Sequence, residues 1–126
     1  MGLKYLIDTN TVIEYLNNTL PHNAASLIEK TDSHISVITR MEMLAWPKAT
    51  LLHIQYLQSF INASVVFNLE EPIILKAIEI RKNYRVKLPD SIVAGTAVVY
   101  NLALITRNRV DFEKIEGLKV IDPYSL

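Results

Sequence analysis

The chain has 126 residues with no formal net charge at pH 7, and half of its residues are apolar. This length and composition fit one globular domain with a hydrophobic core, and they exclude an intrinsically disordered chain. A neutral chain has no global field that attracts nucleic acid or a membrane surface, so any nucleic acid must bind through a local basic patch or a metal ion.

The sequence contains no cysteine, which excludes disulfides, thiolate metal sites and cysteine nucleophiles. That absence fits a reducing compartment. The apolar run before Asp8 is too short for a secretory signal, so we expect a cytoplasmic protein. The longest apolar run, residues 92–105, is interrupted by Thr96 and Asn101 and falls short of the roughly 20 residues of a membrane helix. We therefore expect no association with a membrane.

Five short apolar runs predict the strands of a sheet. They are residues 4–7, 34–38, 65–67, 103–105 and 119–121. Helical patterns separate most of these runs. This alternation predicts an α/β domain with a central, mostly parallel sheet of four to five short strands and helices on both faces.

The helices are predicted from apolar spacing and from residues typical of helix ends. Two Thr-x-x-Glu segments, 11–14 and 39–42, have the spacing of a capping box, which predicts helices beginning near residues 10–11 and at residue 39. Pro21, Pro72 and Pro89 suit the first turns of three further helices. The expected helices are 11–18, 21–30, 39–46, 50–61, 72–85 and 88–100, and residues 106–113 are expected to form a loop.

Four acidic residues lie where predicted strands end or predicted helices begin. Asp8 follows the first strand, Glu42 lies in the first turn of the helix after the second strand, and Asp111 lies in the loop after the fourth. Asp90 lies in the first turn of the helix before the fourth strand. Because the carboxyl ends of parallel strands share one edge of a sheet, the first three acids can converge there. Asp90 joins them only if its helix begins at that edge.

Four converging carboxylates repel one another, which raises their proton affinities or requires a cation. With oxygen ligands only, and no His or Cys nearby in the sequence, that cation would be Mg²⁺ or Mn²⁺. Such a site can bind phosphate and orient water, so its natural reaction is hydrolysis of a phosphodiester. Each acid also has an ordinary structural interpretation: Glu42 can cap its helix, and Asp90 can complement a helix dipole.

The order of these acids and their neighbours resembles the PIN-domain ribonucleases, and most closely the VapC toxins of toxin–antitoxin pairs. The matching segments are Leu-Ile-Asp-Thr-Asn (6–10), Ser-Val-Ile-Thr-Arg-Met-Glu (36–42), Leu-Pro-Asp-Ser-Ile-Val-Ala-Gly-Thr-Ala (88–97) and Thr-Arg-Asn-Arg-Val-Asp-Phe (106–112). The resemblance implies one PIN-like nuclease domain over residues 1–126 that cleaves RNA with Mg²⁺ or Mn²⁺. It also implies a homodimer and a cognate antitoxin protein that neutralises the toxin.

The resemblance assigns roles to individual residues. Four carboxylates match the acidic quartet that binds the metal and forms the catalytic site: Asp8, Glu42, Asp90 and Asp111. Three polar residues match those that accompany the quartet: Asn10, Thr106 and Asn108. Family members differ in whether the acid or the asparagine contributes most at the fourth position, so the resemblance leaves both candidates there.

Two groups of cations lie near the acids in the sequence. Arg107 and Arg109 lie in the loop after the fourth strand, which favours contact with the RNA backbone. Arg85 and Lys87 lie just before the helix of Asp90 and are also candidate RNA contacts. They equally suit a solvated helix end, where cations complement the dipole.

The helix predicted over residues 50–61 has more apolar residues than one buried stripe needs. The surplus can form a groove for an antitoxin helix, or it can be buried in the core or in a dimer. For the whole chain, the alternative function is a non-catalytic PIN-like module that binds RNA or protein. A phosphatase or phospho-acceptor built on Asp8 is disfavoured, because Asn10 stands where its second Asp is expected.

Overall fold

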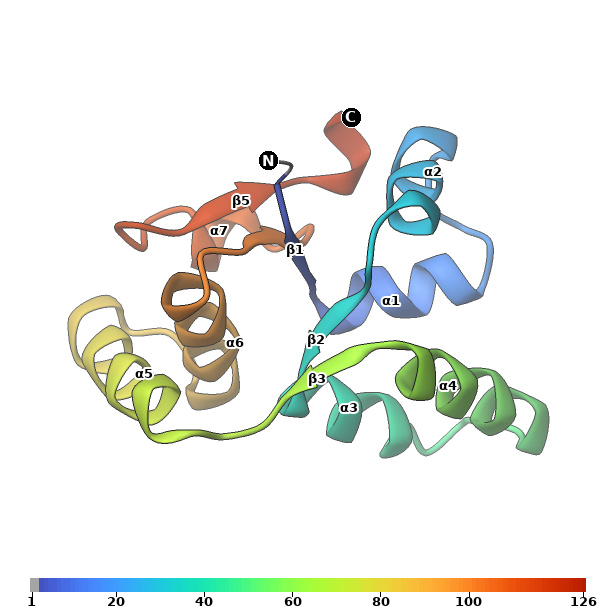
Figure 1. Cartoon of the computed structure of the whole chain (residues 1–126), viewed down its shortest axis with the longest axis horizontal. Coiled ribbons are helices and arrows are strands. Elements are labelled where there is room, and N and C mark those ends of the chain that lie inside the picture. The colour runs from blue at the N-terminus through green and yellow to red at the C-terminus, as the bar shows by residue number, and fades with distance from the viewer. Residues whose placement is uncertain (1–2) are drawn as a thin grey trace.

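The computed structural model describes residues 3–126, which form a five-stranded sheet with helices on both sides (Figure 1). All neighbouring strands are parallel, and the sheet order is β3-β2-β1-β4-β5. The strands are β1 (Tyr5–Ile7), β2 (His34–Ser36), β3 (Val65–Phe67), β4 (Ala103–Ile105) and β5 (Lys119–Ile121). The predicted α/β fold with a parallel sheet is therefore confirmed.

The helices follow the predicted order. They are α1 (Thr9–Leu16), α2 (His22–Lys30), α3 (Val37–Leu44), α4 (Leu51–Ala63), α5 (Glu71–Tyr84), α6 (Leu88–Val99) and α7 (Arg109–Phe112), with a final 3₁₀ turn η1 (Pro123–Ser125). The short helix α7 occupies part of the segment that the sequence predicts as a loop. Among residues 3–126, none of the helices has the length and apolar character needed to cross a membrane.

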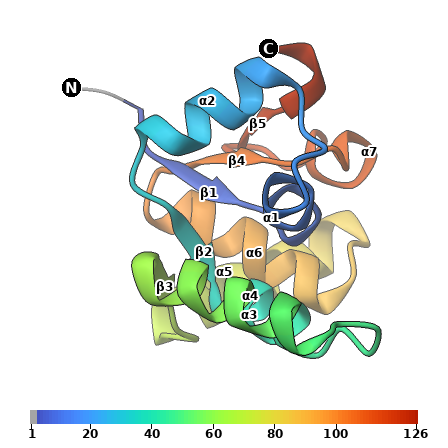
Figure 2. The same cartoon turned by 90° about the vertical axis from the view of Figure 1, so that its right-hand side faces the viewer.

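Side chains that alternate along β1 and β4 divide the core into two layers. Leu6 and Leu104 pack on the side of α5, α6 and α7, whereas Ile7 and Ile105 pack on the side of α1, α2, α3 and α4 (Figures 1 and 2). All four side chains are buried. Burial of both faces explains why these strands are continuous apolar runs with no polar alternation.

The expected capping box at residues 11–14 is wrong. Helix α1 begins at Thr9, with Asp8 as its N-cap. The Thr11 side chain is buried and donates a hydrogen bond to the Ile105 carbonyl of the neighbouring strand, so it is not available as a cap. The acid at the end of β1 thus starts the helix itself, and strand and helix follow each other with no loop between them.

The expected capping box at residues 39–42 is also wrong. Ser36 ends β2 and caps α3, accepting a hydrogen bond from the Ile38 N–H at 3.1 Å. The second strand is therefore shorter than the predicted 34–38, and Glu42 lies in the second turn of α3. Since Glu42 does not cap this helix, the ordinary interpretation of its carboxylate no longer applies.

Helix α6 is fixed by close packing against α5. A Cβ atom on Gly95 would lie 3.2 Å from the backbone nitrogen of Ala77 and 3.3 Å from the carbonyl oxygen of Ile73. Such contacts are tighter than most Cβ contacts in proteins, and both are with backbone atoms, so glycine favours the close approach of the two helix backbones. This packing holds the first turn of α6, which carries Asp90.

Candidate active site

A polar cavity of about 410 Å³ lies where β1 and β2 end and α6 begins. It is lined by Asp8, Thr9, Asn10, Glu42, Lys87, Pro89, Asp90 and Asn108. Three of the four predicted acids therefore meet in one place, which is called the acidic pocket below. Helix α6 begins at the edge where the strands end, which is the orientation that residue spacing alone left undecided.

Asp8 is the most enclosed of the pocket's carboxylates, with 8% of its surface exposed. Its Oδ1 accepts a hydrogen bond from the Thr9 N–H at 2.9 Å, and its Oδ2 accepts one from the Thr106 hydroxyl at 2.8 Å. Burial raises the pKa of Asp8, and the charge of Glu42 adds to the rise. The two hydrogen bonds act in the opposite direction, because they stabilise the ionised carboxylate.

Thr106 links Asp8 to the residues after β4. Its buried hydroxyl, besides donating to Asp8, accepts a hydrogen bond from the Asn108 N–H at 3.0 Å. Asn108 in turn donates through Nδ2 to an Asp111 oxygen at 2.9 Å and caps α7. Asn108 lines the pocket and Asp111 does not, so the structure brings the asparagine closer to Asp8 and positions the fourth acid through it.

Glu42 is held by a threonine that the sequence does not single out. Thr9 Oγ1 lies 2.6 Å from Glu42 Oε1 and 3.1 Å from Thr39 Oγ1. Thr9 and Thr39 are both buried, so they connect α1 to α3 beneath the pocket. Only the position of Thr9 beside Asp8, at the start of a helix, could have drawn attention to it in the sequence.

Asp90 shows the electrostatic effect of the convergence most clearly. Burial raises its pKa to about 6, and the charges of Asp8, Asp111 and Glu42 contribute to the rise. Lys87 lowers the pKa, but by less. The three other acids of the predicted quartet all act on this carboxyl group, so Asp111 belongs electrostatically to the cluster although it does not line the pocket.

The acidic pocket offers carboxylate oxygens, which are the type of donor that suits a hard divalent cation. Carboxylate oxygens are the ligands that Mg²⁺ and Mn²⁺ prefer. Burial raises the pKa of Asp8 and of Asp90, and a cation would relieve the charge repulsion that adds to this rise. Within residues 3–126, no three Asp, Glu or His side chains are placed closely enough to hold an ion together. For three of these side chains to hold an ion together, side chains at the pocket would have to move.

The predicted RNA-contacting cations lie in different settings. Lys87 lines the acidic pocket, and Arg107 lines a cavity beside it. Arg109 forms an ion pair with Glu113 one turn along the chain. Arg85 is exposed and ends α5 in the left-handed conformation, with φ 53°. Lys87 and Arg107 are thus the two cations that the structure places beside the site.

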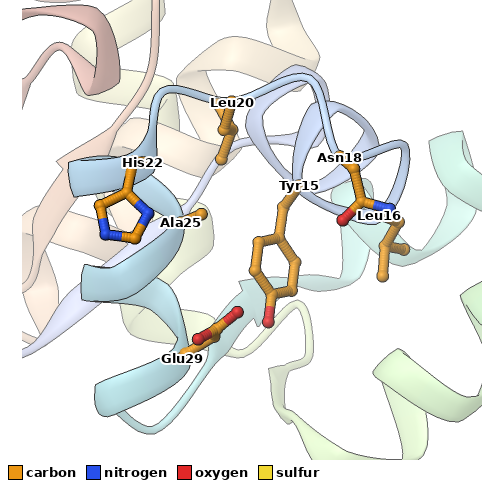
Figure 3. Close-up of a pocket in the computed structure, with 7 residues that line it drawn as sticks. All are labelled: Tyr15, Leu16, Asn18, Leu20, His22, Ala25 and Glu29. Carbon is orange, nitrogen blue, oxygen red and sulfur yellow. The ribbon is translucent and has the colours of Figure 1, made fainter.

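A separate hollow of about 420 Å³ lies between α1 and α2, and none of the predicted site residues lines it. Figure 3 shows the Tyr15 ring of α1 extending toward Glu29 of α2, with His22 on the same helix. Burial raises the pKa of Tyr15, and the charge of Glu29 adds to the rise. Apolar side chains line this hollow together with the polar ones, and the acids of the sheet edge take no part in it.

Helix α4 exposes part of its apolar surface. Leu57 and Ile61 are buried in the core, whereas Leu51, Leu52 and Tyr56 are 84%, 56% and 57% exposed. The surplus apolar residues predicted for this helix are therefore not covered within residues 3–126. The exposed face, defined by Leu51, Leu52 and Tyr56, is referred to below as the α4 face.

A parallel α/β sheet with acidic residues at the carboxyl ends of its strands is typical of enzymes that bind their ligands at that edge. Comparison with known families identifies the family to which this chain belongs. The model of the PIN domain family matches residues 5–118, so this chain belongs to the PIN domain family. The predicted resemblance to that family is confirmed.

The proteins to which this chain is similar include a VapC endonuclease and solved toxin–antitoxin complexes. The chain is 28% identical to the tRNA(fMet)-specific endonuclease VapC of Salmonella typhimurium, over 95% of this chain and 98% of the relative. It is similar to the solved toxin–antitoxin complex from Klebsiella pneumoniae, with 31% identity, coverage of 96% and 98%, and a TM-score of 0.79. It is also similar to DNA-bound VapBC from Salmonella typhimurium, with 26% identity, coverage of 97% and 99%, and a TM-score of 0.83.

Proposed function

We propose that this protein is a Mg²⁺- or Mn²⁺-dependent endoribonuclease and the toxin of a VapBC-type toxin–antitoxin pair. The observation that carries the proposal is the convergence of Asp8, Glu42 and Asp90 on one pocket, with Asp111 close enough to raise the pKa of Asp90. A VapC relative that is named as an endonuclease specific for tRNA(fMet) supports the reaction class and an RNA substrate.

Each carboxylate has a role in this proposal. Asp8, Asp90 and Asp111 hold the ion, and Glu42 completes the site or orients the attacking water. The bound ion supplies Lewis acidity and lowers the pKa of water, so no side chain has to act as general base. Asn10, Thr106 and Asn108 support the acids, because each lines the pocket or bonds to a residue that does.

The chain's own residues prepare the site in two ways. The hydrogen bonds from Thr9 and Thr106 hold Asp8 in one orientation and favour its ionised form. The Asp90 carboxyl group, with a pKa raised to about 6, is mostly ionised at neutral pH and can accept a cation without prior loss of a proton. Lys87 and Arg107 are the first candidates for contact with the RNA backbone, followed by Arg85 and Arg109.

Cleavage of RNA by the purified protein tests this function directly. We expect cleavage with Mg²⁺ or Mn²⁺ and none in the presence of a chelator. Asp8→Asn should abolish cleavage, because it removes a proposed ligand while it keeps the size of the side chain. Lys76→Ala, which removes a paired cation of α5 that lines neither the acidic pocket nor the cavity beside it, is the control and should cut like the wild type.

Two outcomes contradict the proposal. Full cleavage by Asp8→Asn would show that this acid is not needed for catalysis. Cleavage in the presence of the chelator would show that the reaction does not need a metal ion. A wild-type protein that binds RNA and does not cut it, with or without Mn²⁺, supports the alternative of a non-catalytic binding module.

The proposed partners follow from the same family relationship. The complexes from Klebsiella pneumoniae and Salmonella typhimurium pair a toxin with an antitoxin, and the exposed α4 face offers apolar surface to such a partner or to a second copy of this chain. We expect a homodimer of the purified protein by light scattering and loss of cleavage on adding the cognate antitoxin. We also propose that this activity takes place in the cytoplasm, where the proposed substrate RNA and antitoxin would be present.

A further inference from the structure

A second cavity of about 460 Å³ lies beside the acidic pocket and shares Asn10 and Asn108 with it. Its other lining residues are Ile13 and Glu14 of α1 and Arg107, which follows β4. Because two residues border both spaces, a ligand chain can pass from the acidic pocket into this second cavity. The proposed ion site uses only the first of the two.

Arg107 is held in the second cavity by two side chains from distant parts of the sequence. Its Nη1 donates to Glu14 Oε2 at 3.0 Å, and its guanidinium carbon lies 4.1 Å from the centre of the Tyr124 ring. The Tyr124 hydroxyl donates to the same Glu14 oxygen at 3.0 Å. An exposed arginine normally samples many rotamers, and these contacts favour one of them for Arg107.

Glu14 is the more enclosed partner of the ion pair. Its side chain is 22% exposed, against 54% for Arg107. In the part of the chain that the structure describes, Glu14 Oε1 is the single buried side-chain polar atom without a hydrogen-bond partner. A carboxylate with one oxygen desolvated in this way depends on its cation, so Glu14 retains Arg107. The pair therefore presents its positive member to the solvent side.

We propose that the second cavity is a subsite for the nucleotide next to the cleaved phosphodiester, in which Arg107 binds that nucleotide's phosphate. Glu14 and Tyr124 are positioning residues that act through Arg107. This inference rests on the proposed ribonuclease function. Three acids and Lys87 line the first pocket, whereas the one acid of the second, Glu14, is already paired with Arg107. The exposed part of the Arg107 guanidinium can therefore bind a phosphate that is not cut. Holding Arg107 in place beforehand lowers the entropic cost of binding.

Salt-dependent RNA binding tests the phosphate contact. The probe is a short labelled single-stranded oligouridylate, and the protein carries Asp8→Asn so that the RNA stays intact. Adding Arg107→Ala should make the plot of log affinity against log salt concentration less steep by about 0.7, the loss of one phosphate contact in a single strand. Lys76→Ala is the matched control, since it also removes a cation paired with a carboxylate, and it should leave the slope unchanged.

Steady-state cleavage separates positioning from general structure. Arg107→Ala should raise KM about tenfold with little change in kcat, as expected for loss of a charged hydrogen bond that is made before the chemical step. Tyr124→Ala should raise KM when Arg107 is present and should have no further effect in the Arg107→Ala protein. If Tyr124→Ala raises KM equally in the wild type and in the Arg107→Ala protein, Tyr124 does not act through Arg107.

A second variant guards against a folding defect. Arg107→Ala leaves the Glu14 carboxylate without its cation, whereas Arg107→Ala combined with Glu14→Gln removes the unpaired charge. Both proteins should show the same change in salt slope and KM. If the salt slope is unchanged in both proteins, the proposed subsite is contradicted, even when the wild type cuts RNA. If the wild type does not cut RNA, the ribonuclease function is contradicted instead.

Discussion

The hydroxyl of Thr106 lies 2.8 Å from Oδ2 of Asp8 and joins the ends of β4 and β1 at the acidic pocket. The same hydroxyl accepts a hydrogen bond from the Asn108 N–H. The buried Thr106 side chain thus orients Asp8 and also the backbone that leads to Asp111. This arrangement makes Thr106 a structural centre of the site, although it carries no charge.

Replacing Thr106 by valine should weaken the site while it preserves side-chain shape. The variant loses the hydrogen bond that lowers the pKa of Asp8, and it leaves the Asn108 N–H without its acceptor. We expect the free energy of unfolding to fall by about 1–2 kcal/mol and cleavage to fall roughly tenfold. Thr106→Ser, which keeps the hydroxyl, is the control for denaturant unfolding and for the cleavage assay. Equal behaviour of the valine and serine variants would contradict this role.

Thr9 should matter for the same reason at the other side of the pocket. Thr9→Val removes the hydroxyl 2.6 Å from Glu42 and frees that carboxylate to turn toward solvent. We expect the kcat of RNA cleavage to fall about tenfold, the effect of losing one charged hydrogen bond, while Thr9→Ser retains most of the rate. If Thr9→Val cuts RNA at the wild-type rate, Glu42 does not need this partner.

Asp90 should make the stability of the metal-free protein depend on pH. Its pKa is raised from 3.8 to about 6, so the folded state binds this proton more tightly than the unfolded state. Its contribution to stability is therefore greatest below about pH 4, decreases as the pH rises to about 6, and is constant above that range. The full shift corresponds to about 3 kcal/mol, which solvent screening of this partly exposed group reduces to about 1 kcal/mol.

Thermal unfolding in a chelator between pH 4 and pH 7.5 measures this effect. Asp90→Asn cannot ionise, so the difference in melting temperature between Asp90→Asn and the wild type should grow in favour of the variant as the pH rises. A difference that stays constant across the range would mean that neither burial nor the other acids raise the pKa of Asp90.

Asp8→Asn should fold and, without metal, unfold at a temperature equal to or above that of the wild type. Burial and the charge of Glu42 raise the pKa of Asp8, so its ionised form costs free energy at neutral pH. Asparagine avoids that cost, although it weakens the hydrogen bonds from Thr9 and Thr106, so the net change in stability should be zero or a small gain. A metal-free melting temperature well below the wild type would argue against clustered charges.

The sequence predicted the strands and most helices because their signals are local. Five apolar runs and the prolines that open helices identify these elements without knowledge of the fold. The starts of α1 and α3 could not be predicted in the same way, because Thr-x-x-Glu has the spacing of a capping box whether or not it caps. In the structure Asp8 and Ser36, the residues that follow or end the strands, take that role.

The acids of the site were identified from their order along the chain, and their contacts were not. Thr9 and Thr39 lie 30 residues apart and leave no local pattern, yet they support Glu42. The direction of α6 depends on its close packing against α5 at Gly95, which no spacing of acids encodes. Tertiary packing therefore supplied what residue spacing left open, namely that Asp90 lies beside Asp8.

Calorimetric titration of the purified protein with Mn²⁺ tests the central claim most directly, namely that the acidic pocket binds a hard divalent cation. We predict saturable binding to the wild type at neutral pH and strong weakening in Asp8→Asn and in Asp90→Asn, with Lys76→Ala unchanged. Absence of binding at millimolar Mn²⁺, or equal binding by the wild type and both pocket variants, would contradict the claim.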